Sequence, residues 1–208
     1  MTRASSRWGR DFDAERLANL ELGMWKAYYR RRGGLLFRLL VRANREQARV
    51  GWVRAIVAAV WLAVAAVWFG RSQGDYERFE PLIARGYRML GLPADVDVDE
   101  VARRELRWWV VRREIGLAAG EAAGQAITAL YAAIYGVPEA LVSDAGRLRG
   151  EAAEVRDRGA AADPSGPLGE GRAYWPEVGR LLRESYRSLH AALAVESLHD
   201  SSARTGGA

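Results

Sequence analysis

The chain has 208 residues, no cysteine and a formal net charge of +5 at pH 7. This length suits one domain with a core of its own. The absence of cysteine excludes disulfides, thiolate nucleophiles and cysteine-ligated metal centres, and it favours a cytoplasmic protein.

The positive charge is concentrated near the N-terminus and consists almost entirely of arginine. Residues 1–54 carry 13 basic and five acidic side chains, and Lys26 is the single lysine among 31 basic residues. Together with the abundance of alanine and glycine, this arginine-rich composition indicates the codon usage of a G+C-rich bacterial genome. It is therefore weak evidence for phosphate recognition. The first 20 residues contain seven charged side chains and no apolar stretch, so we expect no secretory signal.

Helical periodicity predicts a first helix over residues 13–32 and a second over residues 35–49, separated by the glycines at 33 and 34. The second helix has an apolar face and a basic face. The basic face consists of Arg38, Arg42, Arg45 and Arg49. Clustered positive charge of this kind can meet nucleic-acid phosphates, lipid headgroups, an acidic protein or solvent alone. Only Phe37 lies near these arginines, which disfavours stacking on single-stranded nucleic acid.

The segment 51–70 is the most apolar part of the chain. It has no polar face and is uncharged from Ala55 to Phe69. This length falls between that of a typical buried helix and that of a membrane span. Two interpretations therefore stay open: a central helix that the other helices wrap, or a membrane span or anchor.

Further helices are predicted over residues 75–90, 98–115 and 121–135. Asp75 is the predicted N-cap of the first of these, and Asp97 with Glu100 has the spacing of a capping box before the second. At the start of the helix predicted over residues 121–135, Gly120 and Gly124 permit close approach of a neighbouring helix.

A seventh helix is predicted from near Ser143 to Gly159, followed by a Gly/Pro-rich loop at 159–173 and an amphipathic last helix. Residues 197–208 are predicted to form a disordered tail. The expected fold is therefore all-α: a single bundle of seven or eight helices with a central apolar helix, forming one domain over residues 1–196.

Three charged residues break the amphipathic pattern. Glu21 lies on the apolar face of the first helix, and Glu105 with Arg112 lies on that of the fifth. A buried charge is costly unless it is paired, so these residues predict either a functional pocket or structural ion pairs. The full set of pocket candidates is Glu21, Trp25, Tyr28, Glu105, Trp109 and Arg112.

No motif in the chain indicates a metal, a cofactor or a nucleotide. The two histidines, His190 and His199, lack the Glu-x-x-His spacing of ferritin-like di-iron sites. The glycine patterns match neither the Walker nor the dinucleotide fingerprint. We therefore expect no cofactor and no metal site.

Three functional hypotheses remain, and the sequence does not decide between them. The first is a soluble helical protein that binds a protein or a small ligand without catalysis. The second is an enzyme that uses Glu21, Glu105 and Arg112 in a pocket. The third is a membrane-associated protein anchored through residues 51–70, with the basic second helix at the headgroups of the inner membrane.

Overall fold

The computed structural model describes residues 9–163 and 172–205, with side chains through residue 196. This part of the chain contains eight α-helices, two short 3-10 turns and no strand. The helices are α1 (Ala14–Tyr29), α2 (Gly33–Ala48), α3 (Trp52–Arg71), α4 (Glu80–Leu90), α5 (Val98–Ile115), α6 (Gly120–Tyr135), α7 (Glu139–Ala162) and α8 (Trp175–Thr205). The predicted all-α bundle is confirmed.

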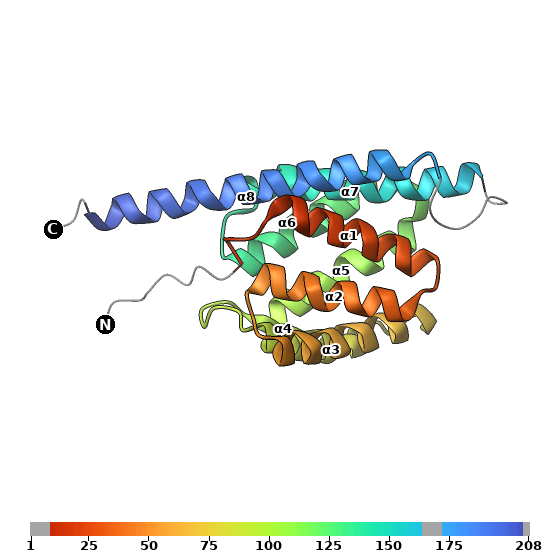
Figure 1. The fold of residues 1–208 in the computed structure, drawn as a ribbon, viewed down its shortest axis with the longest axis horizontal. Helices are drawn as coiled ribbons and strands as arrows, with labels where there is room; N and C mark the ends of the chain where they lie inside the picture. The colour runs from red at the N-terminus through yellow and green to blue at the C-terminus, as the bar shows by residue number, and fades with distance from the viewer. Residues whose placement is uncertain (1–8, 164–171, 206–208) are drawn as a thin grey trace.

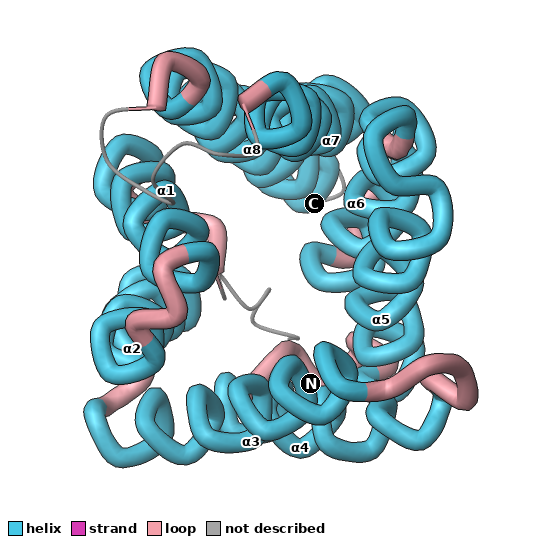
Figure 2. The backbone as a smooth tube through the Cα atoms, turned by 90° about the vertical axis from the view of Figure 1, so that its right-hand side faces the viewer, coloured by secondary structure: helices cyan, strands magenta, loops and turns pink. Residues whose placement is uncertain are grey.

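The eight helices form a closed ring (Figures 1 and 2). Each helix packs against the next in the sequence, and α8 packs against α1 to close the ring. Large apolar side chains fill the main core, among them Leu17 of α1, Ile83 of α4, Ile127 of α6 and Leu182 of α8. Because each of these helices lies beside its sequence neighbours, short connections are sufficient to build the ring.

Side chains cap the starts of α1 and α5, and the cap of α1 is Asp13, which accepts a hydrogen bond from the backbone N–H of Arg16. Asp97 accepts hydrogen bonds from the backbone N–H groups of Asp99 and Glu100, which confirms it as the N-cap of α5. Glu100 pairs with Arg103 and Arg104 in place of the reciprocal capping-box bond. Asp75 does not cap α4. It has φ +48, and a 3-10 turn at Glu77–Phe79 separates it from the helix.

The predicted boundaries near the C-terminus need correction. Helix α7 starts at Glu139, directly after Pro138, and continues through Gly159 to Ala162. Gly159 serves close packing, because a Cβ there would lie 2.5 Å from the ring of Tyr174. Within the rest of the predicted loop, residues 164–171 lie outside the described part of the chain.

Helix α8 also extends further than predicted. Its backbone stays helical to Thr205 where the sequence suggested a tail from residue 197, since no glycine or proline occurs there before Gly206. Residues 206–208 lie outside the described part of the chain.

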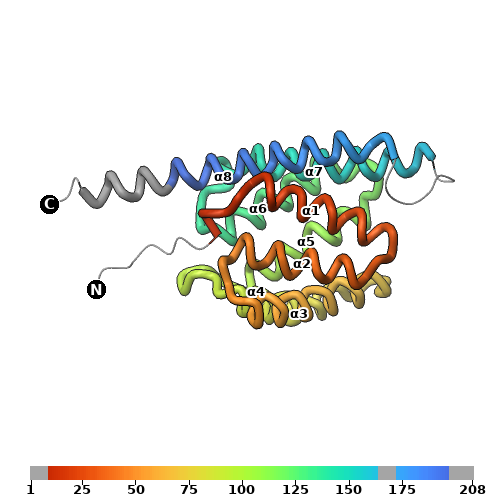
Figure 3. Tube along the Cα trace, viewed as in Figure 1, coloured from red at the N-terminus to blue at the C-terminus, as the bar shows by residue number. Residues whose placement is uncertain are grey.

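Helix α3 forms one side of the ring, between α2 and α4 (Figure 3). Among the described helices, it is the one long and apolar enough to cross a membrane, yet only 28% of its most apolar stretch is buried. The apolar helix is therefore present as predicted, and it is packed on one side. The reason is that α3 has the two partners α2 and α4, and the side away from them stays open.

The two sides of α3 differ in side-chain size. The buried side consists mainly of small residues, namely Ala55, Ala58, Ala59, Ala65 and Phe69. The exposed side carries large apolar residues, namely Trp52, Val53, Ile56, Val60, Val67 and Trp68. Burial normally favours the large apolar side chains, so this arrangement is opposite to the one that would stabilise an isolated bundle.

Helices α6 and α7 approach each other closely through glycines, as the sequence predicted for Gly120 and Gly124. A Cβ on Gly150 of α7 would lie 2.3 Å from the carbonyl oxygen of Gly120 and 2.5 Å from the backbone nitrogen of Gly124. Backbone atoms cannot move away as a flexible side chain can. The contact between α6 and α7 therefore requires glycine at position 150.

Replacing Gly150 by alanine is expected to lower the free energy of unfolding by about 2 kcal/mol or more, because the added methyl group forces the two helices apart. Gly34→Ala is the matched control, since Gly34 lies in α2 with no atom near its absent Cβ. The control should be neutral or stabilising. Urea unfolding followed by circular dichroism measures both, and equal stability of the two variants would contradict the close approach.

Candidate functional site

Glu21 is buried at the centre of a network that joins four helices. The residue is 1% exposed. Arg149 of α7 donates to Glu21 Oε1 from Nε at 2.8 Å and lies 2.6 Å from it through Nη2. Trp25 Nε1 donates to the same oxygen, and the Tyr186 hydroxyl of α8 donates to Oε2. Arg149 also donates to the hydroxyl of Tyr131 on α6.

Glu105 has neutral partners. The Tyr87 hydroxyl donates to Glu105 Oε2 at 2.9 Å, and Trp109 Nε1 donates to Oε1 at 3.0 Å. No ion pair is formed by Glu105 within the described residues, although the positive charge of Arg149 acts on the same region. Glu105 is half-buried, so solvent contributes to its stabilisation.

Arg112 forms a second ion pair, with Asp157 of α7. Its Nε and Nη2 donate to the two oxygens of Asp157 at 3.0 and 2.9 Å, which is a bidentate pair. Nη2 also donates to the Tyr29 hydroxyl at 2.6 Å. Arg156 donates to Asp157 and stacks over the ring of Tyr29. The guanidinium of Arg112 lies 5.4 Å from the ring of Trp25.

The structure therefore brings together some of the predicted pocket residues. Trp25 connects Glu21 to Arg112, whereas Glu105 and Trp109 belong to the neighbouring group around Tyr87. Tyr28 is 56% exposed and lies outside both groups. In each group the charged atoms are engaged by side chains of the bundle itself, the arrangement expected of structural ion pairs.

The sequence interpretation did not identify Arg149 and Asp157 of α7. The buried residues of α7 include Ala145, Gly146, Ala152 and Ala153, and Arg149 follows the same helical spacing. A helical projection of α7 would thus have placed Arg149 on its inner face. The stripe of small residues made that face hard to recognise.

Burial dominates the electrostatics of the tyrosines in these networks. It raises the pKa of Tyr87 well above 10, and the neighbouring Glu105 carboxylate adds to the effect. Burial and the Glu21 carboxylate likewise raise the pKa of Tyr186. Burial disfavours the charged form of Arg149, yet the Glu21 carboxylate outweighs it and raises the pKa of Arg149. These tyrosines therefore stay neutral, as hydrogen-bond donors, over the physiological range.

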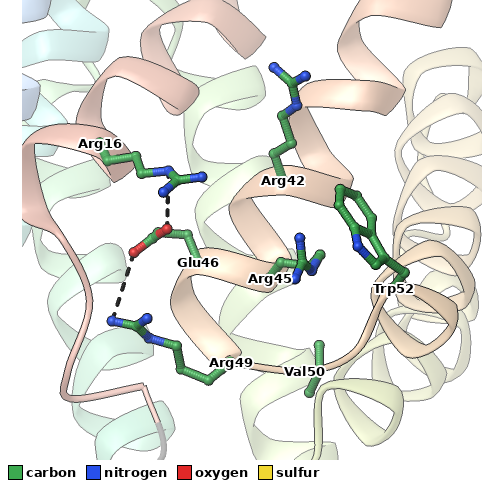
Figure 4. A pocket seen from close by; sticks show the side chains of 7 residues that line it. All are labelled: Arg16, Arg42, Arg45, Glu46, Arg49, Val50 and Trp52. Atoms are coloured by element: carbon green, nitrogen blue, oxygen red, sulfur yellow. Dashed lines mark ion pairs between the residues drawn. The ribbon is translucent and has the colours of Figure 1, made fainter.

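A separate hollow lies on the surface where α1, the end of α2 and the start of α3 meet (Figure 4). It has a volume of about 630 Å³. Three arginines of the predicted basic face line it, and the side chains that form it are Arg16, Arg42, Arg45, Glu46, Arg49, Val50 and Trp52. Arg38, the fourth predicted arginine, is exposed on α2 and does not line the hollow.

The charges of this hollow are only partly paired. Glu46 is buried and forms an ion pair with Arg16 at 3.1 Å, and Arg49 donates to the backbone oxygen of Asp11. Arg45 stacks on the ring of Trp52 at 3.8 Å, and its buried Nε has no hydrogen-bond partner. Within the described residues, Arg42 is exposed and makes neither a hydrogen bond nor an ion pair.

Comparison of the chain with protein-family models, curated proteins and solved structures finds no match. In the described ranges, histidine and acidic side chains form no group of three that could hold a metal ion. The features of the described structure that bear on function are therefore the outward side of α3 and the arginine-lined hollow.

Glu21→Gln is expected to lower the free energy of unfolding by about 3 kcal/mol, because it leaves the buried charge of Arg149 without its counter-ion. Glu177→Gln is the matched control. Glu177 pairs with Arg180 at the surface of α8, where such pairs contribute little. Urea unfolding measures both variants, and equal stability would contradict a central role for the Glu21–Arg149 pair.

We also expect stability to fall at alkaline pH. Below about pH 10 the buried tyrosines are neutral in both states, and above it the unfolded chain loses protons that the folded chain retains. The free energy of unfolding should therefore decrease as the pH rises from 10 towards the higher folded pKa values. Tyr87→Phe should make the decrease less steep than in the wild-type chain, because it removes one of the buried hydroxyls. A stability that stays constant from pH 9 to 11 would contradict the account.

Proposed function

We propose that the protein is a non-catalytic, peripheral membrane-binding protein that lays the exposed side of α3 on an anionic lipid surface. The observation that supports this most strongly is the distribution of side chains on α3. Alanines face the bundle, and tryptophan, valine and isoleucine face outward. Val53 is 74% exposed. Exposed apolar patches of this kind mark protein or membrane interaction sites.

The ends of the exposed side suit the interface of a bilayer. Trp52 and Trp68 are both exposed and stand 16 positions apart, which corresponds to about 24 Å along a helix. Tryptophan favours the headgroup region, where an apolar ring and a polar N–H are both accommodated. A helix lying in the plane of the interface would place both rings at this level.

The charge around α3 selects an anionic partner. Residues 30–74 contain nine arginines and one acidic residue, Glu46, which is buried and paired. Anionic lipids attract such a segment at about 1 kcal/mol per basic residue near the surface. The same charge disfavours self-association through this face, because two copies would bring arginines towards arginines.

A peripheral arrangement agrees with the packing of α3 better than a span does. The buried side of α3 contacts α2 through Ala55 and Ala59. On the other flank Leu62 lies against Gly86 of α4, where an added Cβ would be 2.8 Å away. A span would remove α3 from both contacts. Lying flat keeps them, and it fits a cytoplasmic protein that reaches the inner membrane.

The enzyme hypothesis has less support. Glu21 and Arg112 are held by Arg149 and Asp157, partners within the bundle, and Glu105 by the hydroxyl and indole donors of Tyr87 and Trp109. A general acid or base needs a proton-accepting atom within reach of a substrate. The arginine-lined hollow described above is lined by none of these groups.

Val60→Glu is expected to weaken binding to vesicles of phosphatidylcholine and phosphatidylglycerol by about tenfold or more, because it removes apolar area and adds repulsion from the lipid charge. Val195→Glu on α8 is the matched control, with nearly the same exposure, 46% against 44%. Co-sedimentation with vesicles measures the binding of each variant. Circular dichroism verifies that both remain folded.

Two outcomes would contradict the proposal. One is that the wild-type chain stays in the supernatant with anionic vesicles at low ionic strength. The other is that Val60→Glu and Val195→Glu weaken binding equally, which would place the contact on another surface.

A further inference from the structure

The arginine-lined hollow beside Trp52 has more positive charge than its own carboxylate can neutralise. Four arginines line it and face a single acidic residue, Glu46. The C-terminus of α2 and the N-terminus of α3 meet here, so the negative and positive ends of their helix dipoles offset each other. The positive potential of the hollow therefore comes from the arginine side chains. Its volume of about 630 Å³ falls within the range of small-molecule sites, roughly 300–1,000 Å³.

Two of the arginines are available to a ligand. Arg16 is paired with Glu46, and Arg49 donates to the backbone oxygen of Asp11. Arg42 and Arg45 form no hydrogen bond and no ion pair among the described residues. Guanidinium groups that line a hollow without an acceptor can donate charge-assisted hydrogen bonds to an anion that enters it. Trp52 holds the guanidinium of Arg45 in place by stacking at 3.8 Å.

The charge balance distinguishes between kinds of anion. With Glu46 neutralised by one arginine, three positive charges remain around the hollow. A phosphodiester carries one negative charge, whereas a phosphomonoester carries about 1.5 to 2 near pH 7 and has three terminal oxygens to accept hydrogen bonds. Arginine recognises phosphate oxygens in a bidentate manner. The charge of a phosphomonoester therefore matches the hollow better than that of a phosphodiester.

The position of Trp52 identifies the source of that anion. This side chain closes one side of the hollow and also begins the exposed side of α3 (Figure 4). A phosphate in the hollow thus lies next to the surface proposed to meet the bilayer. We infer that the hollow binds the phosphomonoester headgroup of an anionic lipid through Arg42 and Arg45. This inference rests on the proposed function, because it takes α3 to lie on the membrane.

The test compares two vesicle types with the full chain. Phosphatidylcholine vesicles contain either phosphatidic acid, a phosphomonoester, or phosphatidylglycerol, a phosphodiester, adjusted to the same surface potential. Because the surface potentials match, a difference in binding reports recognition of the headgroup. The wild-type chain should prefer phosphatidic acid by about tenfold, the gain expected from one or two additional charge-assisted hydrogen bonds.

Arg42→Ala/Arg45→Ala should remove this preference and leave weaker, equal binding to both vesicle types. The matched control is Arg38→Ala/Arg107→Ala, which removes the same charge from two exposed positions outside the hollow. The control should weaken binding to both vesicles and retain the preference. Arg42→Ala alone should also reduce the preference. Because the Arg42 side chain is exposed and has no partner among the described residues, this variant should fold like the wild-type chain.

The outcomes separate failure of this inference from failure of the proposed function. If wild type binds both vesicle types equally, or the hollow variant keeps the preference, the headgroup site is wrong and membrane binding through α3 stands. If wild type binds neither vesicle, the membrane function fails and the inference fails with it. Calorimetry with glycerol 3-phosphate tests the source. Binding of this soluble phosphomonoester that Arg42→Ala/Arg45→Ala abolishes, without any vesicle binding, would replace the lipid by a free phosphate ester.

Discussion

The ion pair between Glu21 and Arg149 is the constraint on which the bundle depends. A carboxylate as buried as that of Glu21 is tolerated only with a counter-ion and further donors, and these come from α7 and α8 as well as from Trp25 of α1 itself. Glu21 thereby links α1 to α7 through Arg149 and to α8 through Tyr186, and the packing of α8 against α1 closes the ring of helices. Replacing it by apolar residues could give equal stability, so we interpret it as a feature that specifies which helices meet.

The packing between α2 and α3 is less extensive than the packing of the main core. Their shared contact is a small cluster around Val41, Ala55 and Ala59, separate from the main core. The alanines of α3 contribute little apolar area to the interior, and its valines and tryptophans contribute theirs to the outer surface. A sequence selected for the bundle alone would have the opposite distribution. The outward side of α3 is thus best explained by a partner, and the surrounding arginines indicate that this partner is anionic.

The sequence predicts the helices better than it predicts their faces. The range of α5 is given correctly, because Asp97 is a strong N-cap and Gly116 ends the helix. Aspartate favours N-cap positions, but Asp75 has φ +48 and lacks the backbone conformation of a cap. Gly159 predicts the end of a helix, yet it lies within α7 against Tyr174. The outward side of α3 could not be derived, because an entirely apolar helix has no polar side to show its orientation. Arg149 was missed for a related reason, since its neighbours on α7 are small residues with little apolar signal.

Site-directed spin labelling tests most directly whether the outward side of α3 contacts the bilayer. The chain has no cysteine, so Val60→Cys and Val195→Cys each provide one labelling site. With anionic vesicles, the nitroxide at position 60 should become more accessible to oxygen and less accessible to a water-soluble nickel chelate. The nitroxide at position 195 should stay in water. If the label at position 60 keeps its aqueous accessibility while the protein is bound to vesicles, another surface makes the contact and the account of α3 is wrong.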